Sequence, residues 1–90
     1  MKGMLGMDIA QVRALSPEIR GRAGEVVGVV DRLSGALEAV DWAGDDRDRF
    51  LREWLDVHAP ALRALASSMQ AAARDAANSA TAQEHAAGLA

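Results

Sequence analysis

The chain has 90 residues and a net charge of −3, and its length allows one small domain. It has no cysteine, so it contains no disulfide bond and no thiolate metal site. Its negative charge argues against nucleic acid as a main partner, because phosphate binding needs a basic surface. Aromatic residues make up only 3% of the chain while alanine and leucine are abundant, which favours helices over strands. No apolar run approaches the roughly 18 residues of a membrane-spanning helix, so we expect no stable membrane insertion.

The first helix is predicted over residues 8–40. Asp8 is expected to cap it, because Gln11 lies three residues on, as in a capping box. Residues 1–7 are expected to be flexible, and they lack the apolar core and cleavage site of a secretory signal peptide. Apolar residues recur every three or four positions, which indicates one buried helix face. That face consists of Ile9, Val12, Leu15, Ile19, Ala23, Val26, Val30, Leu33, Leu37 and Val40.

Pro17 interrupts this first helix. Ser16 and Pro17 have the residue types of an N-cap and a first helical residue. Two interpretations are open: one helix with a kink at Pro17, or a short segment followed by a main helix that starts at Ser16. We favour the kinked helix, because the apolar pattern keeps its phase across the proline.

A turn is predicted at residues 41–45, which read Asp-Trp-Ala-Gly-Asp. Gly44 suits the left-handed conformation that ends many helices. Asp45 is expected to cap the second helix, with Asp48 three residues later. This concentration of turn and cap residues predicts the main break in the chain.

The second helix is predicted over residues 46–81, with a bend at Pro60, because proline cannot donate a hydrogen bond to the carbonyl of Asp56. Residues 82–90 are rich in alanine and are expected to fray. The apolar face of this helix consists of Phe50, Leu51, Trp54, Leu55, Val57, His58, Ala61, Leu62, Leu65, Met69, Ala72, Ala76 and Ala80.

A turn this short makes the two helices antiparallel, so the predicted fold is an all-α helix-turn-helix hairpin. Gly21, Gly24, Gly28 and Gly35 each cost the first helix about 1 kcal/mol relative to alanine, so packing must supply its stability. Both apolar faces are wider than one neighbouring helix can cover. We therefore predict that two hairpins dimerise into a four-helix bundle. The predicted hairpin and dimer interface consists of Ile19, Val26, Val30, Leu33, Leu37, Phe50, Leu51, Trp54, Leu55, His58, Leu62, Leu65 and Met69.

Three of these glycines form a stripe on the first helix. Gly21, Gly28 and Gly35 are seven residues apart and lie away from the apolar face. The stripe either permits the close approach of a third helix or is an exposed surface that tolerates glycine. We favour the exposed surface, because charged residues flank the stripe.

The sequence contains no pattern typical of catalysis or metal binding. Catalysis needs a nucleophile, a base and an orienting group, and the chain has only two histidines, His58 and His85. His58 lies on the apolar face of the second helix, where we interpret it as an interface residue. The acidic residues near the turn lack the spacing of an EF-hand and suit helix caps instead. We expect no catalytic site, no metal and no cofactor.

The tripeptide Trp42-Ala43-Gly44 lies near the middle of the chain, between two amphipathic helices. This combination resembles the WXG-100 (ESAT-6-like) family of type VII (ESX) secretion systems, and the resemblance covers residues 8–80. Phe50, Trp54 and the segment 60–62 also look like actinobacterial members. The resemblance implies pairing with a copy of itself or a paralogous hairpin, and a role as export substrate or co-secreted partner. A secretion ATPase would be a further partner. The protein would be cytoplasmic before export and then secreted without a cleaved signal peptide.

The chain departs from the family in its tail. Family export signals commonly include Tyr-x-x-x-Asp/Glu after the second helix, but this chain has no tyrosine, and Ala80 stands four residues before Glu84. In the family, that tail and the Trp-x-Gly turn of the partner come together at one end of the dimer. We hypothesise that this chain supplies the turn and that a different protein supplies the tyrosine tail.

Two other functions compete with export. A non-secreted adaptor or chaperone-like hairpin would bind the helical domain of a toxin or effector and stay in the cell, and the missing tyrosine favours it. A membrane-active amphipathic bundle would use the wide apolar faces, but the polar faces lack the lysine and arginine bias of membrane-surface helices. An enzyme is the least favoured class.

Overall fold

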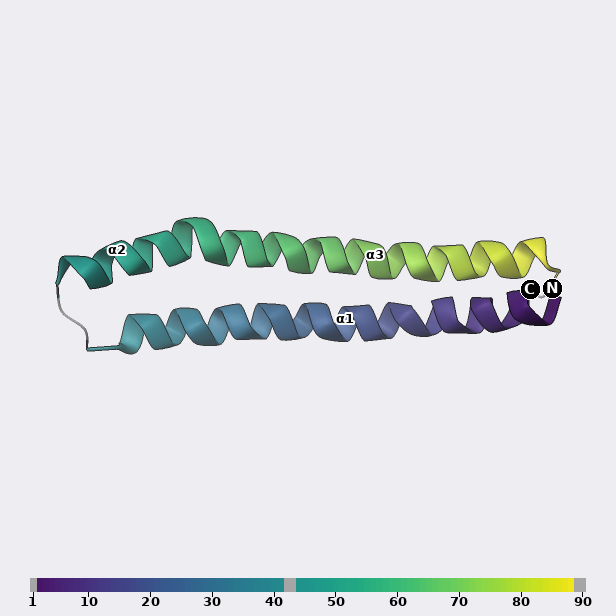
Figure 1. Ribbon diagram of the computed structural model, residues 1–90, viewed down its shortest axis with the longest axis horizontal. Helices are drawn as coiled ribbons and strands as arrows, with labels where there is room; N and C mark the ends of the chain where they lie inside the picture. The colour runs from purple at the N-terminus through teal and green to yellow at the C-terminus, as the bar shows by residue number, and fades with distance from the viewer. Residues whose placement is uncertain (1, 42–43, 89–90) are drawn as a thin grey trace.

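The chain folds into a single helical hairpin. The computed structural model describes residues 2–41 and 44–88, with side chains described from Ile9 onward. Helix α1 (Lys2–Ala39) runs antiparallel to a second rod that is made of α2 (Asp45–Glu53), the π-helical turn η1 (Trp54–His58) and α3 (Ala59–Ala86). The rods lie side by side in a molecule 64 Å long, and the start of α1 lies at the same end as the end of α3 (Figure 1). The predicted all-α hairpin is confirmed.

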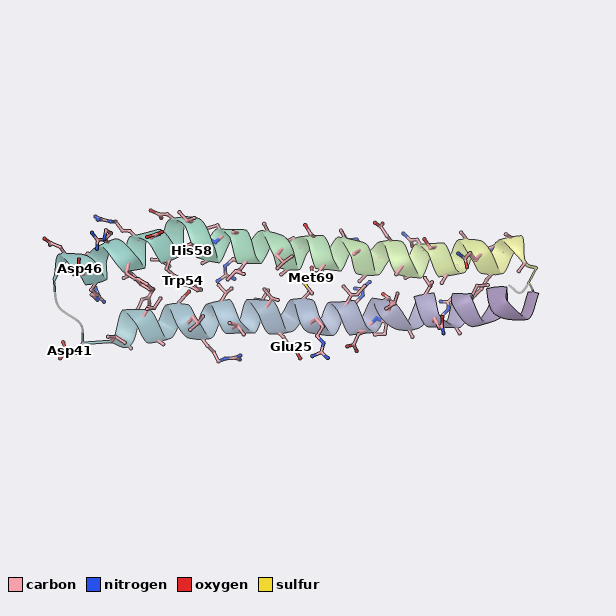
Figure 2. All side chains as sticks on the ribbon, in the orientation of Figure 1. Glu25, Asp41, Asp46, Trp54, His58 and Met69 are labelled. Atoms are coloured by element: carbon pink, nitrogen blue, oxygen red, sulfur yellow. The ribbon has the colours of Figure 1, made fainter. Side chains whose placement is uncertain are left out.

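A seam of small side chains joins the two rods. Along each rod the buried residues are seven positions apart, which is the repeat of a left-handed coiled coil. Because most of them are alanines, the two helices can approach closely, and Val30 is the largest fully buried side chain among those that the structure describes. Half-buried residues such as Met69 flank the seam, and Figure 2 shows Met69 between the helices. The buried residues are Ile9, Ser16, Ala23 and Val30 on α1 and Ala59, Ala66, Ala73 and Ala80 on α3.

Both chain ends are more helical than expected. α1 begins at Lys2, six residues before the predicted start at residue 8, and Asp8 lies inside the helix rather than capping it. α3 continues to Ala86, five residues beyond the predicted end at residue 81, and residues 89–90 of the predicted frayed tail lie outside the described residues. The two terminal segments lie next to each other (Figure 1), and such packing extends helices beyond what their local sequence predicts.

α1 passes through Pro17 without ending. The interpretation of a separate short segment before Ser16 is therefore wrong, because Lys2–Ala39 is one helix. Pro17 is exposed, so its ring projects away from the seam. Its missing N–H leaves the carbonyl of Arg13 without the usual helical donor, at a cost of about 3 kcal/mol or more that the packed seam must offset.

The turn lies where the sequence predicts it, with a different capping residue. α1 ends at Ala39, and the N–H of Val40 still donates to the carbonyl of Ala36 at 3.1 Å. Gly44 has φ 114° and ψ 177° and immediately precedes α2, which begins at Asp45. Gly44 is therefore the N-cap, and the predicted cap at Asp45 is off by one residue. Only glycine adopts this backbone conformation without strain.

The π-helical turn η1 lies directly before Pro60, where the sequence predicts a bend. The N–H of Ala59 donates to the carbonyl of Trp54, five residues back, instead of to the usual fourth residue. This wider turn gives room to the ring of Pro60, which would crowd the carbonyl of Asp56 in a regular helix. It also adds one residue to the seven-residue repeat. The seam therefore continues at half-buried Leu51, eight residues before Ala59, whereas Arg52, seven residues before it, is exposed.

Candidate protein-interaction surface

The residues predicted for the interface divide into two groups in the structure. Those of the first group are buried or half-buried along the hairpin seam, whereas those of the second group are exposed. The seam group consists of Ile19, Val26, Val30, Leu37, Leu51, Trp54, Leu62 and Met69. The exposed group consists of Leu33, Phe50, Leu55, His58 and Leu65. Sequence reasoning misses Ala59, Ala66 and Ala73 as seam residues, and the signal that could identify them is their seven-residue spacing.

One side of the seam is bridged by ion pairs. Arg13 pairs with Glu84, and the guanidinium of Arg63 lies 2.7 Å from the carboxylate of Asp31. Both pairs connect α1 to α3. Arg13, Arg63 and Glu84 each lie four residues after a buried seam residue, which places them on the same side of the seam. Each exposed pair contributes only about 0.2–1 kcal/mol. Their position nevertheless gives this side of the hairpin a polar, bridged surface.

The opposite side of the seam carries exposed apolar side chains. Leu15 and Val29 directly precede the buried Ser16 and Val30, and Leu65 precedes Ala66 in the same way. In an antiparallel pair of helices, equivalent positions lie on the same side, so these residues line one side together. They remain 41–49% exposed, as does Leu33. We define the apolar side as Leu15, Val26, Val29, Leu33, Leu62 and Leu65.

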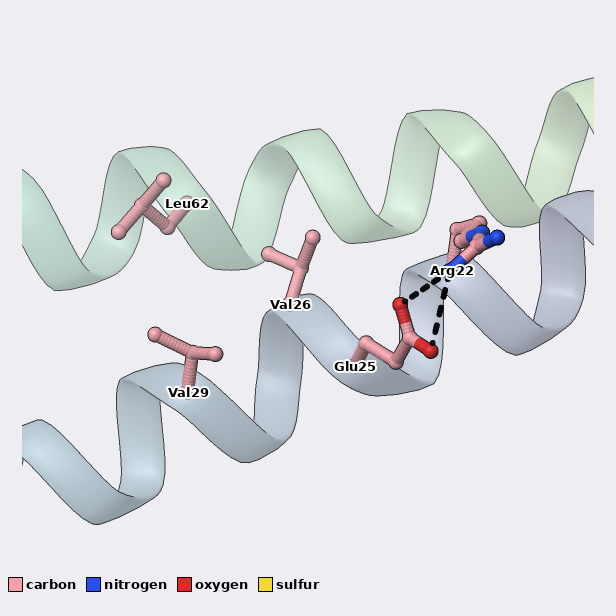
Figure 3. A pocket seen from close by; sticks show the side chains of 5 residues that line it. All are labelled: Arg22, Glu25, Val26, Val29 and Leu62. Carbon is pink, nitrogen blue, oxygen red and sulfur yellow. Dashed lines mark hydrogen bonds and ion pairs between the residues drawn. The ribbon is translucent and has the colours of Figure 1, made fainter.

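An open groove of about 390 Å³ lies on the apolar side. It is lined by Val26 and Val29, which point from α1 toward α3 in Figure 3, and by Leu62 of α3. Arg22 and Glu25 form its rim, with Arg22 Nη1 3.1 Å from a carboxylate oxygen of Glu25. Hydrogen bonding and charge from Glu25, and then from Glu18, raise the pKa of Arg22 above its ordinary value. The groove therefore has an apolar floor and a charged, solvent-exposed rim.

A second groove, of about 280 Å³, lies near the turn end of the hairpin and is lined by Phe50, Glu53, Trp54 and His58. The indole Nε1 of Trp54 donates a hydrogen bond to Ser34 Oγ at 2.8 Å, and Trp54 lies between the helices in Figure 2. His58 Nε2 lies 3.5 Å from Glu53 Oε1, and its ring centroid is 6.3 Å from that of Trp54. His58 is thus part of an exposed groove and does not pack in the seam.

Two of the acidic residues near the turn form local ion pairs. Asp46 accepts from Arg49 at 2.9 Å and Asp48 accepts from Arg47 at 3.4 Å. Within the part of the chain that the structure describes, no three His, Asp or Glu residues are grouped so that they could hold a metal ion. The described helices also include none with the length and apolarity needed to cross a membrane.

The Trp-x-Gly tripeptide falls at the connection between α1 and α2. Trp42 lies outside the described residues, and Gly44 is the N-cap of α2. No protein-family model, no curated protein and no solved structure matches the chain. The resemblance to the WXG-100 family therefore depends on the tripeptide and on its position at the turn of a helical hairpin.

Proposed function

We propose that this protein acts by pairing the apolar side of its hairpin with a second helical hairpin, to form a four-helix bundle. The observation that carries the proposal is the exposure of Leu15, Val29, Leu33 and Leu65 along one side of the seam. Complete burial of such a side chain is worth about 1.5–3 kcal/mol, and these are nearly half exposed, so covering them gains about half of that for each. A hairpin whose own seam is mostly alanine has much to gain from such a partner.

The biological role that we propose is that of a WXG-100-like substrate, or co-secreted partner, of a type VII secretion system. The position of Trp42 and Gly44 between two long antiparallel helices supports it. The chain contains no tyrosine, so the tail signal would come from a paralogous partner hairpin. A secretion ATPase would then recognise the pair, and the protein would leave the cytoplasm without a cleaved signal peptide.

Sedimentation equilibrium between 1 and 100 µM tests the pairing. We expect a dimer of the chain, alone or with the neighbouring gene product when the two are co-expressed. Val29→Asp and Leu65→Asp, made separately, should convert the dimer to a helical monomer. Ser67→Asp is the matched control, because Ser67 is exposed and follows a seam residue directly, as Asp31 does on the ion-paired side. A monomer under both conditions, or equal effects of all three substitutions, would contradict the proposal.

Export is tested in cells that carry the gene. The protein should appear in the culture supernatant, and deleting the secretion ATPase should abolish it there. A second candidate function is an adaptor that binds the helical domain of a toxin or effector and stays inside the cell, and the absence of tyrosine favours it. Retention in the cell, together with recovery of a bound toxin, would support the adaptor and reject export.

A further inference from the structure

The groove near the turn end combines aromatic, acidic and imidazole side chains. Phe50, Trp54 and His58 are four residues apart, so they lie along one face of the α2–η1 rod, and Glu53 lies beside them. The hydrogen bond from Trp54 to Ser34 of α1 fixes the indole in this position. The site is thus preorganised by both rods of the hairpin.

The surroundings of this groove are strongly acidic. Residues 38–56 contain seven Asp or Glu and three Arg, a net charge of −4, whereas the whole chain carries −3 and the remainder therefore +1. Two of the three arginines are held by local partners: Arg47 donates to the carbonyl of Glu38, and Arg49 donates to Asp46. The potential at this end of the rod favours cations over anions.

We propose that the groove of Phe50, Glu53, Trp54 and His58 binds an arginine or lysine side chain presented by a helical partner protein. An indole attracts a cation placed over its ring, and arginine also stacks on aromatic faces. The carboxylate of Glu53 supplies the opposite charge, and His58 contacts it without closing the groove. The acidic end of the hairpin attracts a basic segment before contact. All four residues that line this groove belong to one hairpin, so binding there does not require the hairpin to dimerise.

A defined peptide set tests the proposal. The probes are 16-residue amphipathic helical peptides, with leucines spaced by three and four residues, that carry arginine, citrulline or glutamate at one central position. Citrulline has nearly the shape of arginine without its charge. Binding is followed through the indole N–H resonance of Trp54 and by calorimetry. We expect the arginine peptide to bind about tenfold more tightly than the citrulline peptide, or about 1.4 kcal/mol, and the glutamate peptide to bind most weakly.

Two substitutions connect this preference to the groove. Glu53→Gln should reduce the ratio between the arginine and citrulline peptides to below twofold. Asp56→Asn is the matched control, since Asp56 is exposed in the next turn, does not line the groove and loses the same charge. It should leave the ratio near tenfold.

The result is independent of hairpin pairing when it is measured in the Val29→Asp variant, which should keep the preference for arginine even as a monomer. Equal affinities for the arginine and citrulline peptides, or an equal loss in Glu53→Gln and Asp56→Asn, would overturn the proposal. Absence of binding of any peptide at 1 mM would overturn it too.

Discussion

Trp54 and Ser34 connect the two rods of the hairpin through a hydrogen bond of 2.8 Å between the indole Nε1 and the hydroxyl oxygen. The bond begins within the π-helical turn and ends on α1, twenty residues earlier in the chain. Both side chains are half-buried, so the bond is only partly open to water. It therefore holds the second rod against the first at the place where that rod departs from regular α-helical geometry.

Ser34→Ala should destabilise the protein by about 1 kcal/mol, because a half-buried indole N–H then loses its acceptor. The measurement is the free energy of unfolding in urea. Ser68→Ala is the control, because Ser68 is exposed on α3 and should change stability by less than about 0.5 kcal/mol. In a Trp54→Phe background the effect of Ser34→Ala should largely vanish. An equal effect of Ser34→Ala in both backgrounds would show that the hydrogen bond does not stabilise the fold.

The two helices and the turn could be predicted from sequence because their causes are local. The three- and four-residue apolar spacing identifies each helix, and Gly44 with its acidic neighbours identifies the break. The ends of the helices could not be predicted in this way. Lys2 to Met7 and residues 82–86 are helical in the structure where the two terminal segments lie side by side, and that pairing is not visible in either segment alone.

The seam itself was only partly predictable. Sequence reasoning gives leucine and valine the largest weight, so Leu33 and Leu65 were placed in the interface, and the structure shows them 44% and 49% exposed. The residues that are buried on α3 are alanines, which carry a weak apolar signal. A seam built on alanine is narrow and covers little of the helix surface on either side of it. The apolar residues beside the seam, whose number leads to the prediction of a dimer, therefore stay exposed in the single hairpin.

The alanine seam leads to a prediction about overpacking. Ala66→Leu inserts three carbons between helices that approach closely, so it should cost about 1–3 kcal/mol and lower the melting temperature. Ala64→Leu adds the same atoms on an exposed position of the same helix and should be within about 0.5 kcal/mol of the wild type. Thermal unfolding followed by circular dichroism measures both. Equal melting temperatures of the two variants would contradict a tightly packed seam.

The glycine stripe on α1 should be a place where stability can be gained. A Cβ at Gly21 or Gly35 would meet nothing within 4 Å, so Gly→Ala at each site should stabilise the protein by about 0.5–1 kcal/mol. Gly44→Ala should destabilise it instead, because the φ of Gly44 is 114°. Urea unfolding gives the three values. If the stripe were a surface for close helix approach, Gly21→Ala and Gly35→Ala would weaken partner binding while raising the stability of the hairpin.

The π-helical turn leads to a prediction about chain length. Leu51 and Ala59 are eight positions apart, one more than the seam repeat, and η1 contains the extra residue. Deleting Val57 restores the seven-residue spacing and should give a regular α-helix. We expect the deletion to be tolerated when Pro60 is also replaced by alanine, because proline inside a regular helix costs about 3 kcal/mol.

The control is deletion of Ala64 in the same Pro60→Ala background. It removes one residue from a segment where the repeat is already seven, so it should rotate the rest of α3 by about 100° relative to the seam. Circular dichroism and urea unfolding should then show near-native stability for the Val57 deletion and a loss of cooperative unfolding for the Ala64 deletion. If both deletions were equally damaging, the π-helical turn would not be compensating for an extra residue, and Pro60 alone would be its cause.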